Sequence, residues 1–416
     1  MNEEPYMKCD VLVIGGGPSG SYAAKEIATL AKGYKILLIE DHKVIGKPVQ
    51  CAGKISTRAY RELNLPIKSI LNTVKGSYFY SPSGDLILTK KRVPQAYIVD
   101  RGAFDKELCQ EAQDKGVEIL LKTKGLKPLR KNGRICGIVV RQNSSLIEIH
   151  ADVIIDAEGV RSLIAKQCGL PTKKNFVSSF QMEISPVSYE DIESVEVYFS
   201  SKYSPGFFSW IIPVNEHRAR VGIGVKGTLK QASQKLLNFI KKHPVASKKF
   251  GKHWEIKSKL AGLIPMGGPV PITVKDIVML VGDTAGHVKS TTGGGLYFGM
   301  SCAKIAAEIV VDALNKETPL QVRNYENLWR KKFGSELKKS ANMRKFVNNL
   351  KDPTLDTLFK TVSDNTLEPL LERFGDVDYQ SSFVKPFARK LSGLPFKNPK
   401  LTLELLKAII LASSPK

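Results

Sequence analysis

The stretch Cys9–Gly20, which reads CDVLVIGGGPSG, decides the fold of this chain. Its first half, Cys9–Ile14, is an apolar run typical of a strand buried inside a parallel sheet. A glycine-rich turn follows at once, and Ser21–Lys32 then has the pattern of a helix. Because a strand, a glycine turn and a helix occur in that order, the sequence predicts a cradle for a dinucleotide.

The residues of this turn have separate roles. Gly15 permits the tight turn, Gly17 lets the backbone approach a pyrophosphate, and Gly20 lets the helix pack closely on the strand. Pro18 and Ser19 stand at the start of the helix, where unpaired N–H groups point at the phosphates. We therefore expect all five residues to bind the cofactor.

A second apolar strand, Lys35–Ile39, ends on Glu40. This acid lies 20 residues after Gly20, the spacing at which a carboxylate accepts the ribose hydroxyls of an adenosine. A 2′-phosphate at the same place would face the negative charge of Glu40. The first segment therefore favours a cofactor with an unmodified ribose.

Two later segments end in the same kind of acidic turn. Val153–Ile155 leads into Asp156 and then Gly159, within the sequence DAEG. Ile277–Val281 is another apolar strand and leads through a glycine into Asp283. Taken alone, Asp283 could be an ordinary turn residue. Together with the first turn, these segments suit a cofactor longer than NAD, and we expect Asp156, Gly159 and Asp283 to contact it.

A glycine run precedes the next helix. Gly293, Gly294 and Gly295 stand directly before Leu296, which begins a segment of small residues. That helix N-terminus could lie under the pyrimidine edge of an isoalloxazine ring, where negative charge appears on reduction, while Asp283 binds the ribityl hydroxyls. These residues predict FAD as the cofactor, and no metal ion is expected.

The same motifs carry a family resemblance. DAEG resembles the second motif, and VGDTAGHVKSTTGGG the third, of the flavoprotein group that includes para-hydroxybenzoate hydroxylase. The sequence VDR at 99–101, followed by FD at 104–105, resembles the arginine-containing element of that group. The resemblance implies that Arg101 touches FAD and that Gly125, in a loop after the strand Val117–Lys122, lies near the adenine. The alternative for Arg101 is a surface ion pair with Asp105.

The resemblance implies an α/β fold with a discontinuous, Rossmann-like FAD-binding domain of the para-hydroxybenzoate hydroxylase type. An antiparallel-sheet substrate domain is expected beside it, because segments such as Val195–Tyr198 alternate in polarity. From about Pro319 onward we expect a mostly helical, lysine-rich C-terminal region. The expected domains are 1–75, 95–170 and 270–320 for FAD, 76–94 and 171–269 for the substrate sheet, and 321–416 for the helices.

The stretch PGFFSWIIP, residues 205–213, resembles the PxxYxWxFP signature of the geranylgeranyl reductase family. Phe208 replaces the family's tyrosine and loses its hydroxyl, and Ile212 replaces a phenylalanine. The resemblance implies that Phe207, Phe208, Trp210 and Ile212 line the substrate channel, with Trp210 among the catalytic residues. A strand that simply packs into a core is the alternative interpretation.

Two further stretches resemble archaeal members of that family. PVQCAG at 48–53 is similar to a cysteine-containing loop beside the flavin, and residues 350–364 resemble the helical tail of archaeal digeranylgeranylglycerophospholipid reductases. The resemblance implies that Cys51, Ala52 and Gly53 lie near FAD. Cys51 could position an alkene or relay a proton, or it could serve only in packing, because a thiol is a poor acid for this step.

The expected reaction is the FAD-dependent reduction of isoprenoid C=C bonds, as in geranylgeranyl chains of archaeal-type lipid precursors. A flavin monooxygenase, a flavin halogenase and a basic nucleic-acid-binding protein that is not an enzyme are the alternatives. The chain shows no RNA- or DNA-binding motif and spreads its basic residues evenly, so nucleic acid is not an expected partner. NAD(P)H or a ferredoxin could supply the electrons, because a second glycine-rich nucleotide cradle is missing.

The net charge is +23, from 63 basic and 40 acidic side chains. Such a charge attracts polyanions, and the alternative interpretation is a lysine-rich surface that only keeps the protein in solution. A lipid with an anionic headgroup and an anionic membrane surface would fit this charge. The apolar helix expected at 401–412 could rest on lipid or pack on its own domain. Six scattered cysteines, no signal peptide and no spanning run favour a cytoplasmic protein peripheral to the membrane.

Overall fold

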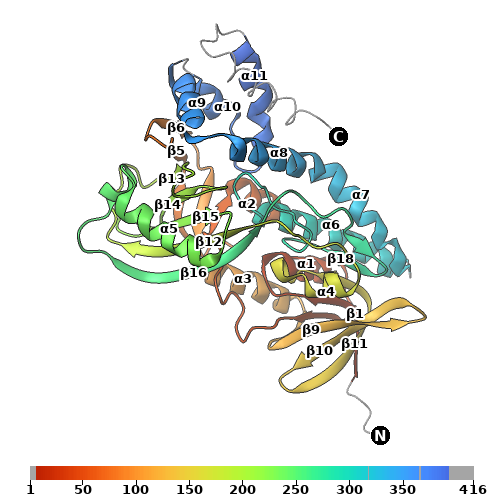
Figure 1. Ribbon diagram of the computed structural model, residues 1–416. Helices are drawn as coiled ribbons and strands as arrows, with labels where there is room; N and C mark the ends of the chain where they lie inside the picture. Colours follow the sequence, from red (N-terminus) through yellow and green to blue (C-terminus); the bar gives the residue numbers. More distant parts are fainter. Residues whose placement is uncertain (1–5, 317, 365–366, 393–416) are drawn as a thin grey trace.

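The computed structural model describes residues 6–316, 318–364 and 367–392 (Figure 1). Three sheets and a group of C-terminal helices make up the described part. The helical tail sits at one end of the molecule, and the sheet that contains the N-terminal strand lies at the other. None of the described helices is long and apolar enough to span a bilayer.

The first sheet has eight strands in the order β17-β18-β11-β1-β2-β8, with β10 and β9 continuing from β11. Its strands are β1 (Tyr6–Ile14), β2 (Ile36–Ile39), β8 (Glu118–Leu120), β9 (Thr123–Lys131), β10 (Arg134–Gln142), β11 (Ser145–Asp156), β17 (Val274–Lys275) and β18 (Val278–Leu280). Strands β18, β11, β1, β2 and β8 run parallel to one another.

The register of these strands brings their carboxyl ends together. Ile14 is paired with Asp156 on one side and with Ile39 on the other, and Asp156 is paired with Leu280. The turns that follow β1, β2, β11 and β18 therefore leave the sheet at one edge. In open parallel sheets this is the edge at which ligands bind.

Helices cover both faces of this sheet. On one face, α1 (Pro18–Leu30) and α6 (Leu296–Asn315) pack against each other and against β1. On the other face, α4 (Leu163–Gln167) packs beneath β9 and β10. Helix α1 begins at Pro18, earlier than the expected start at residue 21, because proline is well suited to the first helical turn.

The second sheet has seven strands in the order β16-β12-β15-β14-β13-β5-β6. Its strands are β5 (Gly76–Tyr80), β6 (Leu86–Lys90), β12 (Phe176–Ser185), β13 (Ser194–Tyr198), β14 (Ser209–Pro213), β15 (Ala219–Val225) and β16 (Glu255–Pro265). Helix α5 (Leu229–Lys242) packs on β12 and β15. The sheet is antiparallel, as expected, except that β5 and β13 pair in parallel. Alternating polarity identifies strands but does not determine their direction.

A small third sheet joins the two larger ones. It contains β3 (Lys54–Ser56), β7 (Ala96–Val99) and β4 (Ile70–Val74), in the order β3-β7-β4. Helix α2 (Thr57–Leu63) follows β3, and α3 (Arg101–Asp114) follows β7. The cysteine loop leads into β3, and the arginine-containing helix α3 follows the neighbouring strand β7. The third sheet therefore brings these two segments together.

The tail is helical, as expected. It contains α7 (Asn324–Trp329), α8 (Ser335–Asn349), α9 (Asp352–Asp364), α10 (Glu368–Phe374) and α11 (Val384–Ser392). Helices α9 and α10 pack on β6, where Ile87, Phe359 and Val362 form a separate core (Figure 1). The helix expected at 401–412 lies outside the described residues.

The contact between Gly20 and the first turn gives a direct test of this packing. A Cβ atom on Gly20 would lie 1.9 Å from the carbonyl oxygen of Gly15, a backbone atom that cannot swing away. We expect Gly20→Ala to lower the free energy of unfolding by about 1–3 kcal/mol in urea denaturation, because α1 must shift.

Gly251→Ala is the matched control, since no atom lies within 4 Å of the added methyl group. Its stability should change by less than about 0.5 kcal/mol. Equal stability of the two variants would contradict the close approach of α1 to β1.

Candidate functional site

The three glycine-rich turns meet at the carboxyl edge of the first sheet. A Cβ on Gly15, whose φ is +101°, would lie 2.5 Å from the carbonyl oxygen of Ala157 in the second motif. The hydroxyl of Thr284 in the third motif donates to the carbonyl of Gly159, at 3.1 Å. Segments more than a hundred residues apart thus form one continuous surface.

The first turn leaves room for a phosphate group. Around the missing Cβ of Gly17 no atom lies within 4 Å, so this side of the turn is open. Gly17 is also the N-cap of α1 and has no side chain with which to cap the helix. Pro18 has no N–H, so the first N–H groups of α1 that are available to a pyrophosphate are those of Ser19 and Gly20. A dinucleotide fits these residues.

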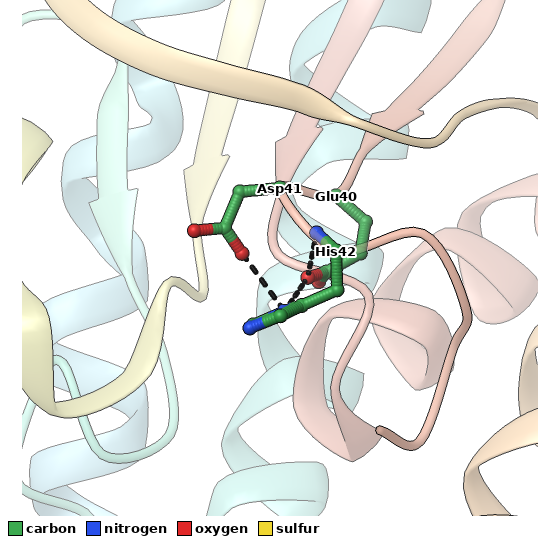
Figure 2. Close-up of side chains that lie close together, drawn as sticks. All are labelled: Glu40, Asp41 and His42. Carbon is green, nitrogen blue, oxygen red and sulfur yellow. Dashed lines mark hydrogen bonds and ion pairs between the residues drawn. The ribbon is translucent and has the colours of Figure 1, made fainter. Parts of the chain in front are cut away.

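Glu40 lies at the end of β2, close to the first turn. Its carboxylate accepts hydrogen bonds from the main-chain N–H groups of Gly16, at 2.7 Å, and His42, at 3.0 Å. Figure 2 shows the side chains of Glu40 and Asp41 pointing toward the ring of His42. The atoms of these three residues that could bind a metal ion lie within 4.8 Å of one another. Two N–H groups thus fix the Glu40 carboxylate beside the first turn, and its contact with the ribose stays a prediction.

Asp156 lies beneath the second turn. Its side chain has no exposed surface, and one of its oxygens accepts from the N–H of Glu158 at 3.1 Å. Burial, reinforced by Glu158, raises the pKa of Asp156. The side chain of Asp156 therefore holds the turn from below and does not reach the surface at which a contact with the cofactor was expected. Gly159 lies on the open side, where no atom is within 4 Å of its missing Cβ.

Asp283 and the glycine run of the third motif are neighbours. A Cβ on Gly295 would lie 3.0 Å from a carboxylate oxygen of Asp283. Gly293 has a φ of +71°, which a residue with a side chain would adopt only with strain. Helix α6 begins at Leu296 without a side-chain cap, as α1 does. Its free N–H groups can therefore stabilise the negative charge of a reduced ring.

Arg101 is buried at the start of α3 and is held by Asp105 through two hydrogen bonds of 3.0 Å. The ion pair considered from the sequence thus exists, but it lies in the interior instead of on the surface. The side chain of Arg101 passes Gly53, whose missing Cβ would lie 3.4 Å from it. This position puts the guanidinium next to the cysteine loop.

The cysteine loop is tied to the second sheet. Gly53 has a φ of +75°, and its N–H donates to the sulfur of Cys51 at 3.4 Å. The guanidinium of Arg220, on β15, donates to the carbonyl groups of Ala52 and Val99, both at 2.8 Å. Sequence reasoning missed Arg220, because a single arginine in a strand carries no motif.

Gly125 does not lie in a loop. It belongs to strand β9, and a Cβ there would approach the side chain of Ile164 in α4 at 3.0 Å. The absence of a side chain at Gly125 therefore lets α4 pack on the sheet. The sequence-based placement was wrong because the strand ends at residue 120 and β9 begins at residue 123.

A cavity of about 590 Å³ connects the loop, the glycine run and the second sheet. Its lining includes Cys51, Gly293, Gly294, Gly295 and Leu296, together with the four expected wall residues Phe207, Phe208, Trp210 and Ile212. Further apolar residues that sequence reasoning missed, Phe199, Phe359, Leu371 and Phe383, line it as well, three of them from the tail helices and their connections. A volume of this size lies within the usual range of ligand sites.

The aromatic wall is rigid. Phe207 and Phe208 stack with ring centres 4.2 Å apart, and Trp210 meets Phe208 edge-on at 5.9 Å. The indole N–H of Trp210 donates to the side chain of Gln181 at 2.9 Å. Since this bond occupies its polar atom, Trp210 can act as an apolar surface but not as a proton donor. These residues are buried, as in a core, and they also border the cavity, while their contact with a substrate stays a prediction.

The electrostatics of Asp283 give a testable pH dependence. Burial raises the pKa of Asp283 to about 6, although Arg101 opposes the shift. Because this pKa lies above that of the unfolded chain, the group favours folding below about pH 4, and this contribution is lost as the pH rises through about 6. For flavin-free protein, Asp283→Asn should raise the free energy of unfolding near pH 8 by about 1–3 kcal/mol in urea.

The same variant should bind FAD more weakly, because an amide replaces the charged acceptor. Asp114→Asn, at an exposed position near the end of α3, should follow the wild-type pH profile and keep its FAD affinity. Tighter FAD binding by Asp283→Asn would remove Asp283 from the cofactor site.

Comparison with known families agrees with this geometry. The model of the FAD dependent oxidoreductase family matches residues 10–262, which is more than half of the chain. A lycopene cyclase protein model matches residues 233–381. The first match begins within β1 and ends within β16, so it includes the first two turns, the cysteine loop and the aromatic wall.

Among solved structures, a geranylgeranyl bacteriochlorophyll reductase-like protein from Thermoplasma acidophilum superposes with a TM-score of 0.84. It is 26% identical, and the match covers 97% of this chain and 100% of that protein. The flavin-dependent brominase Bmp2 superposes with a TM-score of 0.72 at 16% identity, over 93% of this chain and all of the brominase. Because the brominase is only 16% identical, its similarity shows a shared fold and nothing about function.

Curated sequences are similar over almost the whole chain. An uncharacterized protein of Methanocaldococcus jannaschii is 35% identical over 95% of this chain and 98% of its own length. The digeranylgeranylglycerophospholipid reductase 2 of Methanothermobacter thermautotrophicus is 33% identical over 88% of this chain and 94% of its own length. The chain therefore belongs to the FAD-dependent oxidoreductases and, within them, to the family of the digeranylgeranylglycerophospholipid reductases.

Proposed function

We propose that this enzyme uses FAD to reduce the C=C bonds of geranylgeranyl chains in archaeal-type membrane lipid precursors. The name of the Methanothermobacter relative supports this substrate class. The observation that carries the proposal is the cavity itself, which extends from the glycine run to an aromatic wall and onward to apolar side chains of the tail. Such a chamber suits a long hydrocarbon chain better than a small polar substrate.

The chemistry requires a dry chamber. An isolated alkene must gain a hydride and a proton without a carbonyl group to share the developing charge. Reduced FAD, when bound, supplies the hydride. The chain's own residues exclude water and place aromatic faces beside the developing positive charge, and Phe207, Phe208 and Trp210 are arranged for this.

Cys51 lies where the loop enters the cavity, with the N–H of Gly53 donating to its sulfur. We assign it to positioning the alkene against the glycine run. Arg220 fixes this part of the loop, because its guanidinium donates to the carbonyl of the neighbouring Ala52 at 2.8 Å. The competing assignment is that Cys51 relays a proton. The two roles predict different effects of Cys51→Ala on KM, on kcat and on the pH dependence of the reaction.

The supply of electrons and of lipid completes the proposal. We propose NAD(P)H or a ferredoxin as the electron donor, reacting at the flavin without a second nucleotide domain. The net charge of +23 supports a cytoplasmic enzyme that meets its anionic lipid at the membrane surface. Each basic residue near an anionic membrane contributes up to about 1 kcal/mol.

The central test is mass spectrometry of digeranylgeranylglycerophospholipid after incubation with the dithionite-reduced protein. We expect mass gains of two hydrogens per step. Trp210→Ala should keep its flavin content and lose at least about tenfold in turnover, because the wall of the chamber is opened to water.

Trp254→Ala removes a tryptophan outside this cavity and should leave turnover unchanged. If the wild-type protein gave no mass gain while its flavin remained reduced and reoxidisable, the proposed reaction would be wrong.

Cys51 offers a second test with a matched partner. Of the six cysteines only Cys51 and Cys136 are not fully buried, and Cys136 lies on β10, away from the cavity. We expect Cys51→Ala to slow turnover about tenfold and to raise the KM, because the alkene is held less well, with unchanged FAD content.

Cys136→Ala should behave like the wild-type enzyme. A proton relay through Cys51 would instead lower kcat alone and change its dependence on pH, which would overturn the positioning role.

A further inference from the structure

One part of the cavity is lined by cationic side chains. Lys54 comes from β3, Lys289 from the segment between β18 and α6, and Arg344 from α8. Lys289 reaches close to the glycine run, since a Cβ on Gly294 would lie 3.5 Å from its amino group. Two of these charges act on each other, since Lys289 helps to lower the pKa of Lys54.

The acids of the cavity do not balance these cations. Three carboxylates line it: Glu196 is paired with a lysine outside the cavity at 3.0 Å, and Asp376 with Arg58 at 2.5 Å. Asp378 is paired with Lys289 at 3.0 Å. Each of the three thus already has a cationic partner, and none makes an ion pair with Lys54 or Arg344.

Lys54 differs from the other two cations in its surroundings. Among the described residues, its amino group makes neither a hydrogen bond nor an ion pair. Burial, together with the charge of Lys289, lowers the pKa of Lys54 to about 8, with Asp378 acting in the opposite direction. A bound anion would remove this penalty on its charged form.

Arg344 is positioned between the glycine loop and the aromatic wall. Its guanidinium donates to the main-chain carbonyls of Ser290, at 3.0 Å, and Thr291, and it lies over the rings of Phe207 at 4.6 Å and Phe208 at 5.5 Å. Its third nitrogen, Nη1, is buried and has no partner in the part of the chain that the structure describes. Arg344 thus keeps an unsatisfied charged donor beside the cavity, a condition that calls for an explanation.

We propose that Lys54, Lys289 and Arg344 form a seat for the phosphate of the substrate's headgroup. Phosphate oxygens accept several charge-assisted hydrogen bonds at once, which these three donors can supply. The apolar remainder of the cavity then receives the isoprenoid chains. This inference rests on the proposed function and adds to it the residues that recognise the anionic end of the lipid.

The pairing of Asp378 with Lys289 explains how the seat persists without its ligand. Asp378 has 2% of its surface exposed, and one carboxylate oxygen has no hydrogen-bond partner among the described residues. It neutralises one of the three cations and leaves a net positive seat. Replacing Asp378 by asparagine would therefore increase, and not abolish, the attraction for a phosphate.

The test measures binding by the oxidised, FAD-loaded protein, in which no turnover occurs. Tryptophan fluorescence in detergent micelles would compare digeranylgeranylglyceryl phosphate with digeranylgeranylglycerol, which has the same chains and no charge. We expect the phosphate lipid to bind at least about tenfold more tightly. Lys54→Met should reduce this preference below about threefold, Lys54→Arg should keep it, and Asp378→Asn should raise it.

Lys75→Met is the matched control. Lys75 also lines the cavity, but it is already paired with Glu193 at 2.6 Å, so its loss should leave the preference unchanged. Equal binding of the two lipids by the wild-type protein would overturn the proposal. So would a Lys54→Met variant that changes only the reduction potential of the flavin, since Lys54 would then serve the reduced ring.

Two further arms separate the possible sources of failure. Inorganic phosphate should compete with the phosphate lipid only at roughly 10 mM or above, and competition at micromolar concentration would assign the seat to free phosphate and overturn the headgroup assignment. A charge preference without any mass gain would refute the proposed reaction and keep the seat. A mass gain with no charge preference would refute the seat and keep the reaction.

Discussion

The parallel pairing of β1 with β11, and of β11 with β18, is the constraint on which the rest of the structure depends. It places three turns at one edge, and the turns approach so closely that Gly15 and Gly20 have no space for a side chain. Backbone N–H groups and two uncapped helix ends therefore face the same surface. A cofactor with two phosphates and a long ring system requires a surface of this kind, because neither helix end alone could hold both of its ends.

The reaction chamber belongs to no single part of the fold. The cysteine loop, the glycine run and the aromatic wall come from different sheets, and Arg220 joins two of them by donating from β15 to the carbonyls of Ala52 and Val99. The tail helices add Phe359 and Leu371 to the lining. Since each wall is buried against a neighbour, the chamber is preorganised, and this favours a precise placement of the alkene.

Two charged groups of the site, Asp283 and Lys54, are destabilised by burial when no ligand is bound. Burial raises the pKa of Asp283 to about 6 and lowers that of Lys54 to about 8, so the charged form of each is less favourable in the free protein than in water. Ligands that stabilise these charges, through ribityl hydroxyls in one case and a phosphate in the other, recover this free energy. The enzyme is therefore expected to be more stable with FAD and lipid bound.

The sequence alone determined the nucleotide cradle, because strand, turn, helix and acid are set by local backbone sterics within a few dozen residues. It also identified the aromatic wall as a family signature. Only the tertiary structure decided that Asp156 lies beneath its turn, that Gly125 belongs to a strand, and that Lys54 and Arg344 face one cavity. These facts depend on contacts between segments far apart in the chain, and neither periodicity nor spacing encodes such contacts.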